Sequence, residues 1–244
     1  MPRKDTAWKS ATLANKYLQT IRGVIPLASE QLDVMIRAIT SLTEVNRFLD
    51  LGCGSGILSS AILDRFPKAC GALVDFSGPM LAAAREQLAA YADNLTFVDA
   101  DLASPSWVKN LKEKAPYNVI VSGFALHHLT DERKKQIYTE IHDLLQPGGI
   151  FLNIEHVASA TPWVESLFET LFIDRLYEKE QGGARTREEL GKEYYHREDK
   201  KANILALVEH QCQWLRDIGY QDVDCYFKIL ELAVFGGRRA PKVP

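Results

Sequence analysis

Short apolar runs alternate with amphipathic stretches through the middle of this chain. The runs at residues 45–51 and 117–122 end in turn-forming residues, a pattern typical of strands buried in a parallel sheet. The amphipathic stretch at 131–145 predicts a helix, because its apolar residues recur every three to four positions. The predicted strands here are 45–51, 71–77, 94–98, 117–122 and 150–157. Since strands and helices alternate over residues 45–157, we expect βαβ units and a mostly parallel sheet.

Both ends of the chain depart from this alternation. Helices are predicted at 7–22, 28–42, 160–181 and 186–216, and two further strands at 222–228 and 230–236. The chain therefore predicts one α/β domain with a Rossmann-like, mostly parallel seven-stranded sheet, helices on both faces and a helical lid. The expected parts are a helical cap (1–43), a cofactor-binding core (about 44–157), the lid insertion (about 158–216) and closing strands (217–244).

Composition narrows the function classes. The net charge of -3 lacks the basic footprint of a nucleic-acid binder, so we expect a small-molecule substrate and no nucleic acid. No apolar run reaches the roughly 18 residues of a membrane span, and no signal peptide is expected. The 4 cysteines lack C-x-x-C spacing, which indicates reduced thiols and a cytoplasmic protein. The 6 scattered histidines predict no metal site, and the oligomeric state, a homodimer included, stays open.

The stretch FLDLGCGSG (48–56) places glycines directly after a predicted buried strand. Gly52, Gly54 and Gly56 allow tight turning and let bare backbone approach a ligand at the carboxyl end of a strand. A tight turn without a ligand is the alternative. Ile57 occupies the third glycine position of G-x-G-x-x-G, and no Lys-Ser/Thr pair follows. The loop therefore fits neither a dinucleotide fingerprint nor a phosphate-binding P-loop.

Acidic residues follow the next two predicted strands. Asp75 ends the second strand, about 20 residues beyond the glycines, where an acid is the expected acceptor for ribose hydroxyls. A capping or turn role is its alternative. Asp101 follows the third strand and is a candidate acceptor for an adenine amino group, with Asp99 as its competitor.

Five segments resemble, in order, the motifs of class I S-adenosylmethionine-dependent methyltransferases. They are FLDLGCGSG, ALVDFSGPMLAAAR, FVDADL, VIVSGFALHHL and LLQPGGIFLNIEHV, within roughly residues 45–157. The resemblance implies S-adenosylmethionine as the cofactor and methyl transfer as the reaction. It also implies that the glycine loop faces the methionine part, that Asp75 binds the ribose and that the adenine lies beyond. The residues so assigned are Gly52, Cys53, Gly54 and Ser122 towards the methionine part, and Phe76, Met80, Asp101 and Leu102 around the adenine. Asp50 and Gly56 are further candidates for binding the cofactor.

Both ends of the chain are similar to carboxy-S-adenosylmethionine synthase and related small-molecule methyltransferases. The segments are YLQTIRGVIPLASEQLDVMIRAI and WLRDIGYQDVDCYFKILELAVFGG. This resemblance implies a lid built from both ends. Tyr17 and Arg22 are candidates to close over the cofactor, and packing on the helix surface is their alternative. Because GCGSG is the ordinary methyltransferase form, ordinary methyl transfer is favoured.

Methyl transfer requires an aligned acceptor and exclusion of water, and a base only for some acceptors. The candidate catalytic residues at the ends of the fourth and fifth strands are His127, His128 and Glu155. Histidine titrates near neutral pH, which suits a base, and a packed or capping histidine is the alternative. Glu155 is placed to orient a substrate hydroxyl or amine, or to pair with a lid arginine such as Arg175 or Arg187.

Large aromatic residues mark the predicted lid. They are Trp163, Phe168, Phe172, Tyr177, Tyr194 and Tyr195, and their helical spacing favours a core over a pocket. The segment YYHREDK (194–200) is expected to be a solvated, charged turn. The leading hypothesis is methyl transfer to an oxygen, nitrogen or carbon of a small molecule. Carboxy-S-adenosylmethionine synthesis and a non-catalytic cofactor-binding subunit are the alternatives, and Ile57 disfavours a nicotinamide oxidoreductase.

Overall fold

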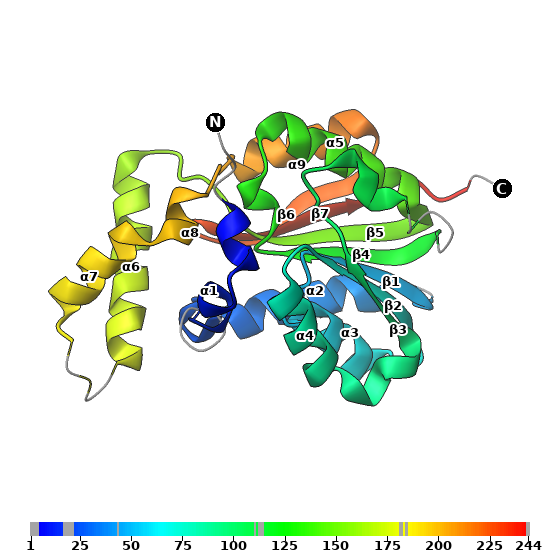
Figure 1. Ribbon diagram of the computed structural model, residues 1–244. Coiled ribbons are helices and arrows are strands. Elements are labelled where there is room, and N and C mark those ends of the chain that lie inside the picture. The colour runs from blue at the N-terminus through cyan, green and yellow to red at the C-terminus, as the bar shows by residue number, and fades with distance from the viewer. Residues whose placement is uncertain are drawn as a thin grey trace.

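Seven strands form one sheet in the described part of the chain (Figure 1). The computed structural model describes residues 5–16, 22–42, 44–109, 111, 115–180, 183 and 185–242. The strands are β1 (Arg47–Leu51), β2 (Cys70–Asp75), β3 (Leu95–Asp99), β4 (Tyr117–Gly123), β5 (Leu145–His156), β6 (Gln221–Ile229) and β7 (Leu232–Arg238). Their order is β3-β2-β1-β4-β5-β7-β6. The pairings of β7 with β5 and β6 are antiparallel, and the other described pairings are parallel. The predicted mostly parallel, seven-stranded sheet is confirmed.

Helices cover both faces of the sheet (Figure 1). One face carries α2 (Ala28–Thr40), α3 (Ile57–Arg65) and α4 (Gly78–Gln87), and the other carries α5 (Asp131–Leu144) and α9 (Val208–Ile218). Shorter helical elements are η1 (Asp5–Lys9), α1 (Ala11–Lys16), η3 (Arg22–Val24), η4 (Ala89–Asn94), η5 (Pro105–Val108) and η7 (Leu126–His128). Because both faces are buried, the central strands read as nearly continuous apolar runs.

An apolar core lies on each face of the sheet, and the side chains of each strand point alternately into one core and the other. In β1, Leu49 and Leu51 join the core beneath α5 and α9, whereas Phe48 joins the core beneath α2, α3 and α4. In β4, Ile120 belongs to the first core, and Val119 belongs to the second. Burial on two faces removes much apolar surface from water and fixes the carboxyl ends of the parallel strands relative to one another.

The last strand, β7, lies inside the sheet between β5 and β6. An added Cβ at Gly236 would lie 2.0 Å from the carbonyl oxygen of Phe151, so only glycine fits this approach to β5. The register pairs Glu155 with Ala233 and His156 with Leu232. The turn between β6 and β7, which contains Glu231, therefore lies beside the carboxyl end of β5.

Two helices, α6 (Pro162–Lys179) and α7 (Arg187–His196), form a third apolar cluster outside the sheet. Their buried residues Phe168, Phe172 and Tyr194 pack together with Val24 and Leu232. The short helix α8 (Glu198–Lys201) follows α7 in the chain. The expected aromatic core therefore forms in part. Three other aromatic residues of the stripe are exposed, namely Trp163, Tyr177 and Tyr195.

The helical ends differ from the sequence-based expectation in three places. The expected helix at 186–216 is interrupted at 202–207, and its last part, α9, packs against α5 and β6 instead of joining α6 and α7. Part of the expected cap, α2, packs against α3 and the sheet, and its first residues line the cavity described below. At the start of the chain, η1 and α1 are separated at Ser10, and residues 17–21 of the expected first helix lie outside the described residues.

Two kinds of feature are absent from the described residues. No helix in this part of the chain is both long enough and apolar enough to cross a membrane. Nor do three or more histidine, cysteine or acidic side chains in it come together in a group that could hold a metal ion.

Candidate functional site

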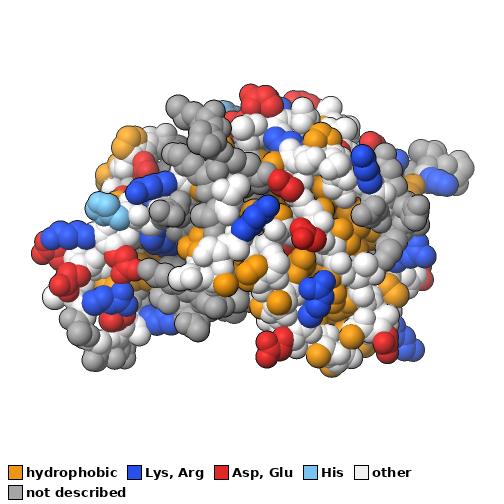
Figure 2. Space-filling view, viewed as in Figure 1, with side chains coloured by type: hydrophobic (Ala, Val, Ile, Leu, Met, Phe, Trp, Pro, Cys, Tyr) orange, Lys and Arg blue, Asp and Glu red, His pale blue; other side chains and the backbone are white. Residues whose placement is uncertain are grey.

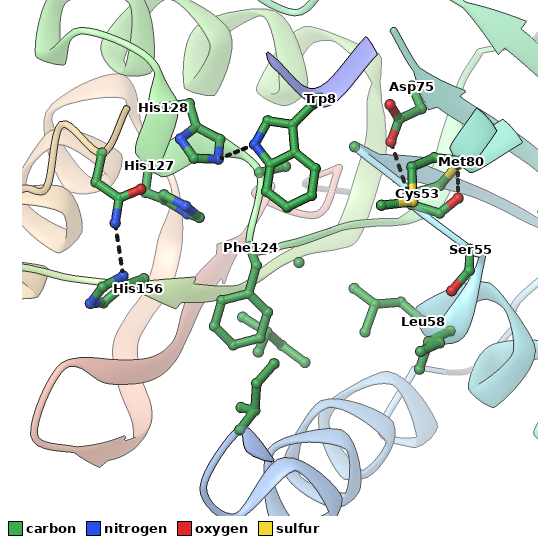
Figure 3. A pocket seen from close by; sticks show the side chains of 18 of the residues that line it. Trp8, Cys53, Ser55, Leu58, Asp75, Met80, Phe124, His127, His128 and His156 are labelled. Carbon is green, nitrogen blue, oxygen red and sulfur yellow. Dashed lines mark hydrogen bonds between the residues drawn. The ribbon is translucent and has the colours of Figure 1, made fainter. Parts of the chain in front are cut away.

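A cavity opens at the carboxyl ends of β1, β2 and β4. The strand order reverses between β1 and β4, and ligands of open α/β sheets bind at such a switch point. In Figure 3, Asp75, Cys53 and Met80 lie on one side of the cavity, and His127, His128 and His156 lie on the other. We call these the cofactor end (Gly52–Ser55, Asp75–Ser77, Met80, Asp101 and Leu102) and the histidine end (His127, His128, His156 and Asn203).

The glycine loop brings bare backbone to the cofactor end. Gly52 has φ 65°, and an added Cβ would lie 2.2 Å from the Cβ of Ala125, so the loop packs directly on the segment after β4. Gly54 has φ 53°, and an added Cβ there would meet no atom within 4 Å. This open space faces the cavity that Gly54 lines. Gly56, also predicted as a cofactor residue, does not line the cavity, and an added Cβ would lie 2.7 Å from Leu88.

Asp75 ties the glycine loop to the end of β2. Its Oδ2 accepts a hydrogen bond from the backbone N–H of Gly54 at 2.9 Å, and its Oδ1 accepts one from that of Ser77 at 2.8 Å. Burial raises the pKa of the Asp75 carboxyl, and these backbone N–H groups oppose that change by stabilising the carboxylate. The carboxylate lines the cavity, as expected of a group that binds ribose hydroxyls.

The other residues expected at the cofactor end divide into two groups. Six line the cavity: Asp50, Cys53, Phe76, Met80, Asp101 and Leu102. Ser122 does not, because its buried hydroxyl donates to the carbonyl of Leu51 at 2.9 Å within the sheet. Asp99 does not line the cavity either, whereas its competitor Asp101 does. Tyr17 and the side chain of Arg22 lie outside the described residues.

Two of these cavity residues have buried functional groups. Asp50 is fully buried, and its Oδ2 accepts a hydrogen bond from the Ser59 hydroxyl at 2.6 Å. Burial raises the pKa of the Cys53 thiol well above its usual value, and the nearby Asp50 and Asp75 carboxylates add to the effect. Cys53 is therefore a neutral thiol and not a nucleophile.

His127 and Glu155 form a buried pair at the histidine end. The Nδ1 atom of His127 lies 2.5 Å from Oε1 of Glu155, and Oε2 of Glu155 accepts from the backbone N–H groups of Leu126 and His127 at 3.0 and 3.1 Å. Burial raises the pKa of Glu155 to about 6, and the backbone N–H of His156 opposes that increase. Glu155 itself does not line the cavity, so it acts on a ligand through His127, which does.

A second acid–histidine pair stands beside the first. Nε2 of His156 lies 2.7 Å from Oε2 of Glu231, and the Ser159 hydroxyl donates to Oε1 of the same carboxylate at 2.7 Å. Nδ1 of His156 lies 3.4 Å from the side-chain nitrogen of Asn203. Both nitrogens of His156 are therefore engaged by the protein. Sequence reasoning missed this pair, although His156 directly follows Glu155 at the end of a predicted strand.

His128 contacts a residue from the start of the chain. Its Nε2 accepts a hydrogen bond from the indole N–H of Trp8 at 3.2 Å, and its ring centroid lies 4.0 Å from that of His127 (Figure 3). Trp8 lies in η1 and lines the cavity. No sequence signal connected these residues, which are 120 positions apart.

Apolar side chains enclose the space beyond the histidines. Phe124 has φ 51° and extends into this space (Figure 3), and a non-glycine residue with that backbone is strained. The remaining apolar wall includes Ile25, Leu32, Ile154, Phe168, Phe172 and Leu232. Such a wall excludes water and suits a small organic molecule.

The segment 194–200 contributes to this wall rather than forming a solvated turn. Tyr194, Arg197 and Lys200 line the cavity from the end of α7 and from α8. Lys200 lies over the Tyr194 ring and pairs with Glu169. The suggested pairing of Glu155 with a lid arginine is wrong. Glu155 pairs with His127, while the two arginines bond elsewhere: Arg175 to Glu178 and Arg187 to Asp174.

Comparison with known families adds an independent line of evidence. Residues 48–149 match the family model described as a methyltransferase domain. The chain is 22% identical over 228 residues to carboxy-S-adenosyl-L-methionine synthase of Nitratiruptor sp., an alignment that covers 91% of this chain and 89% of that protein. It is 33% identical over 101 residues to malonyl-acyl-carrier-protein O-methyltransferase 1 of Ilyobacter polytropus, covering 41% of this chain and 34% of that enzyme.

Solved structures share the fold at low identity. An O-methyltransferase family protein from Burkholderia thailandensis matches with a TM-score of 0.61 and 18% identity, over 85% of this chain and 55% of that chain. Human N-acetylserotonin methyltransferase in complex with S-adenosylmethionine matches with a TM-score of 0.60 and 15% identity, over 96% of this chain and 58% of that chain. This chain thus spans little more than half the length of these two proteins. Residues 48–149 therefore form a methyltransferase domain, and the solved structures share its fold.

Proposed function

We propose that this chain transfers the methyl group of S-adenosylmethionine to a hydroxyl oxygen of a small organic acceptor. The observation that carries the choice of oxygen is the buried His127–Glu155 pair, whose histidine faces the cavity. A hydroxyl must lose its proton when its oxygen is methylated. An imidazole oriented by a carboxylate is suited to accept that proton near neutral pH.

The cofactor end fits an adenosyl amino acid. Gly54 presents backbone with open space beside it, the Asp75 carboxylate lines the cavity, and Phe76 and Met80 supply apolar surface for a purine. Asp101 and Leu102 line the same end and are the candidates for the adenine edge. When bound, S-adenosylmethionine supplies a methyl group that its sulfonium charge already activates.

The histidine end accounts for the remaining chemistry. Because Glu155 Oε1 holds Nδ1 of His127, the proton of the neutral ring lies on Nδ1 and the lone pair lies on Nε2. His127 takes the acceptor's hydroxyl proton at Nε2, and the Glu155 carboxylate stabilises the imidazolium that results. The wall of Phe124, Phe168 and Phe172 keeps water out and aligns an apolar or aromatic acceptor.

The test is a screen of small phenols and alcohols with methyl-labelled S-adenosylmethionine, followed by His127→Ala with the best acceptor. We expect the rate of methyl transfer to fall by roughly 10²- to 10⁴-fold, the usual contribution of a general base. The affinity for S-adenosylhomocysteine, measured by calorimetry, should change by less than about threefold. His210→Ala is the matched control, because His210 is exposed on α9 and does not line the cavity. Full activity of His127→Ala would refute the proposed base.

Carboxy-S-adenosylmethionine synthesis is a second candidate. It is supported by the alignment with such a synthase over 91% of this chain. Mass spectrometry of the cofactor that copurifies distinguishes the two reactions. A species heavier than S-adenosylmethionine by one carboxyl group favours the second candidate. S-adenosylmethionine or S-adenosylhomocysteine alone, together with label transfer to a phenol, favours the first. Tight cofactor binding without turnover of any acceptor would instead indicate a non-catalytic subunit.

We also propose small molecules rather than nucleic acids as partners. On the described side chains of the face in Figure 2, lysine and arginine are interspersed with aspartate and glutamate. Such a surface gives little of the counterion release that drives binding to a phosphate backbone. Cys53 and Cys212 are buried free thiols, which supports a reducing, cytoplasmic setting. Gel-shift titration with single- and double-stranded oligonucleotides tests the first point, with tight binding as the contrary result.

A further inference from the structure

The start of the chain crosses the cavity between its two ends. The carbonyl of Trp8 accepts a hydrogen bond from the Ser77 hydroxyl at 2.7 Å, and its indole N–H donates to Nε2 of His128 at 3.2 Å. Lys9 lies 5.9 Å from the centre of the Phe76 ring. Figure 3 shows the indole lying between His128 and the side that carries Cys53 and Asp75. Trp8 therefore connects the cofactor end to the histidine end.

Because the indole of Trp8 is the donor in this contact, the contact determines which ring nitrogen of His128 carries a proton. An indole nitrogen only donates, so Nε2 of His128 must supply a lone pair, and the ring proton must lie on Nδ1. A proton on Nε2, in either the other neutral tautomer or the imidazolium, would place two N–H groups against each other. The hydrogen bond therefore favours one neutral tautomer of His128.

The protonation state of His128 affects that of the adjacent His127. The centroids of the His127 and His128 rings lie 4.0 Å apart, and two cationic imidazoles at that distance would repel each other. The ring of His127 is hydrogen-bonded to a carboxylate, with its Nδ1 at 2.5 Å from Oε1 of Glu155. Glu155 also interacts electrostatically with His128. The other charged or titratable residues lining this cavity are Asp50, Cys53, Asp75, Asp101, His156, Tyr194, Arg197 and Lys200.

We infer that Trp8 is a positioning residue, which holds His128 as the neutral Nδ1–H tautomer and so leaves His127 as the histidine that takes up a proton. The part played by His127 rests on the proposed function. The state of His128 does not, because it follows from the Trp8 contact alone. The indole of Trp8 thus assigns different roles to two adjacent histidines of the same short element, η7.

The experiment is imidazole ¹⁵N NMR of the full chain with S-adenosylhomocysteine bound. Long-range ¹H–¹⁵N spectra recorded from about pH 5 to about pH 9 report both the tautomer and the titration of each histidine. His128→Gln assigns the signals. In the unmodified chain we expect His128 as the Nδ1–H tautomer. In Trp8→Phe we expect mixed tautomers and uptake of a proton at a pH higher by about 0.7, the equivalent of one neutral hydrogen bond.

Trp163→Phe is the matched control, since Trp163 is 70% exposed on α6 and does not line the cavity. Its His128 signals should match those of the unmodified chain. Ser77→Ala is a second variant, which removes the anchor of the Trp8 carbonyl and should shift His128 in the same direction as Trp8→Phe. An Nε2–H tautomer in the unmodified chain would overturn the inference, even if Trp8→Phe failed to fold. Identical titration of His128 in Trp8→Phe and Trp163→Phe would also overturn it. Neither result depends on turnover, so failure of the proposed reaction is seen separately.

Discussion

The two ends of the cavity are assembled in different ways. The cofactor end uses short stretches that directly follow β1, β2 and β3, and its main contact joins Asp75 to Gly54, 21 positions apart. The histidine end joins His127 to Glu155 across 28 positions, His156 to Glu231 across 75 and His128 to Trp8 across 120. A motif that lies within one βαβ unit can be read from the sequence. A site assembled from distant turns depends on how the whole chain packs.

The largest effect is expected within the glycine loop, where two substitutions separate packing from ligand space. Gly52→Ala should lower the free energy of unfolding by about 3 kcal/mol, because its Cβ would lie 2.2 Å from Ala125 in addition to the strain of φ 65°. Gly54→Ala adds backbone strain without a steric clash, so we expect the free energy of unfolding to fall by only about 1 kcal/mol. Urea unfolding of both variants measures the difference. Equal losses would mean that the contact with Ala125 does not hold the loop.

Asp75→Ala should weaken binding of S-adenosylhomocysteine by about 10- to 150-fold. The carboxylate lines the cavity and orders the backbone of Gly54 and Ser77, and charged hydrogen bonds typically contribute about 1.5–3 kcal/mol. Calorimetry measures the affinity. Glu231→Gln, at the other end of the cavity, is the control and should leave that affinity within about threefold. Unchanged binding by Asp75→Ala would remove the main support for the cofactor end.

Phe172→Leu should raise the KM for the acceptor by about tenfold while leaving the affinity for S-adenosylhomocysteine unchanged. Phe172 lines the histidine side of the cavity and packs against Phe168 and Tyr194, so a smaller side chain loosens the wall without reaching the glycine loop. Steady-state kinetics and calorimetry on the same preparation measure the two quantities. A parallel loss of both would show that the two ends are not independent.

The smallest effect is the dependence on pH. Burial raises the pKa of Glu155 to about 6, so the rate of methyl transfer should be about half maximal near pH 6 and fall further in acid, as the carboxylate that supports His127 becomes neutral. Stability should change in the opposite sense. The folded chain holds this proton more tightly than the unfolded chain, so the contribution of Glu155 to stability increases as the pH falls from about 6 towards the unfolded value near 4.5. Rate profiles and urea unfolding across this range measure both trends.

The sequence predicted the parallel half of the fold well because its signals are local. Apolar runs gave β1, β2, β3 and β4 to within two residues at each end, and turn residues marked where each strand stops. The glycine loop and Asp75 lie at such stops, which is why the cofactor end was predictable. Ser122 lies at a strand end too, but the alternation of side chains directs its hydroxyl to Leu51 within the sheet.

The rest depended on packing between distant segments. A 3.6-residue pattern predicts that a helix buries one face, but it does not say against what, and so α9 was grouped with α6 instead of with α5. The contributions of Trp8 and Glu231 to the histidine end have no signal within their own segments. Arg197 and Lys200 were read as solvated because charged side chains usually are, whereas both line the cavity.

The interior position of β7 also sets an order of assembly. During synthesis the ribosome releases the parallel strands first, and β1 to β5 can pair as soon as they emerge. Glu231 and Leu232 emerge only with the final hairpin, yet they complete the wall around His156. A nascent chain can therefore form the glycine loop, its contact with Asp75 and the His127–Glu155 pair before the hairpin that carries Glu231 closes the wall around His156.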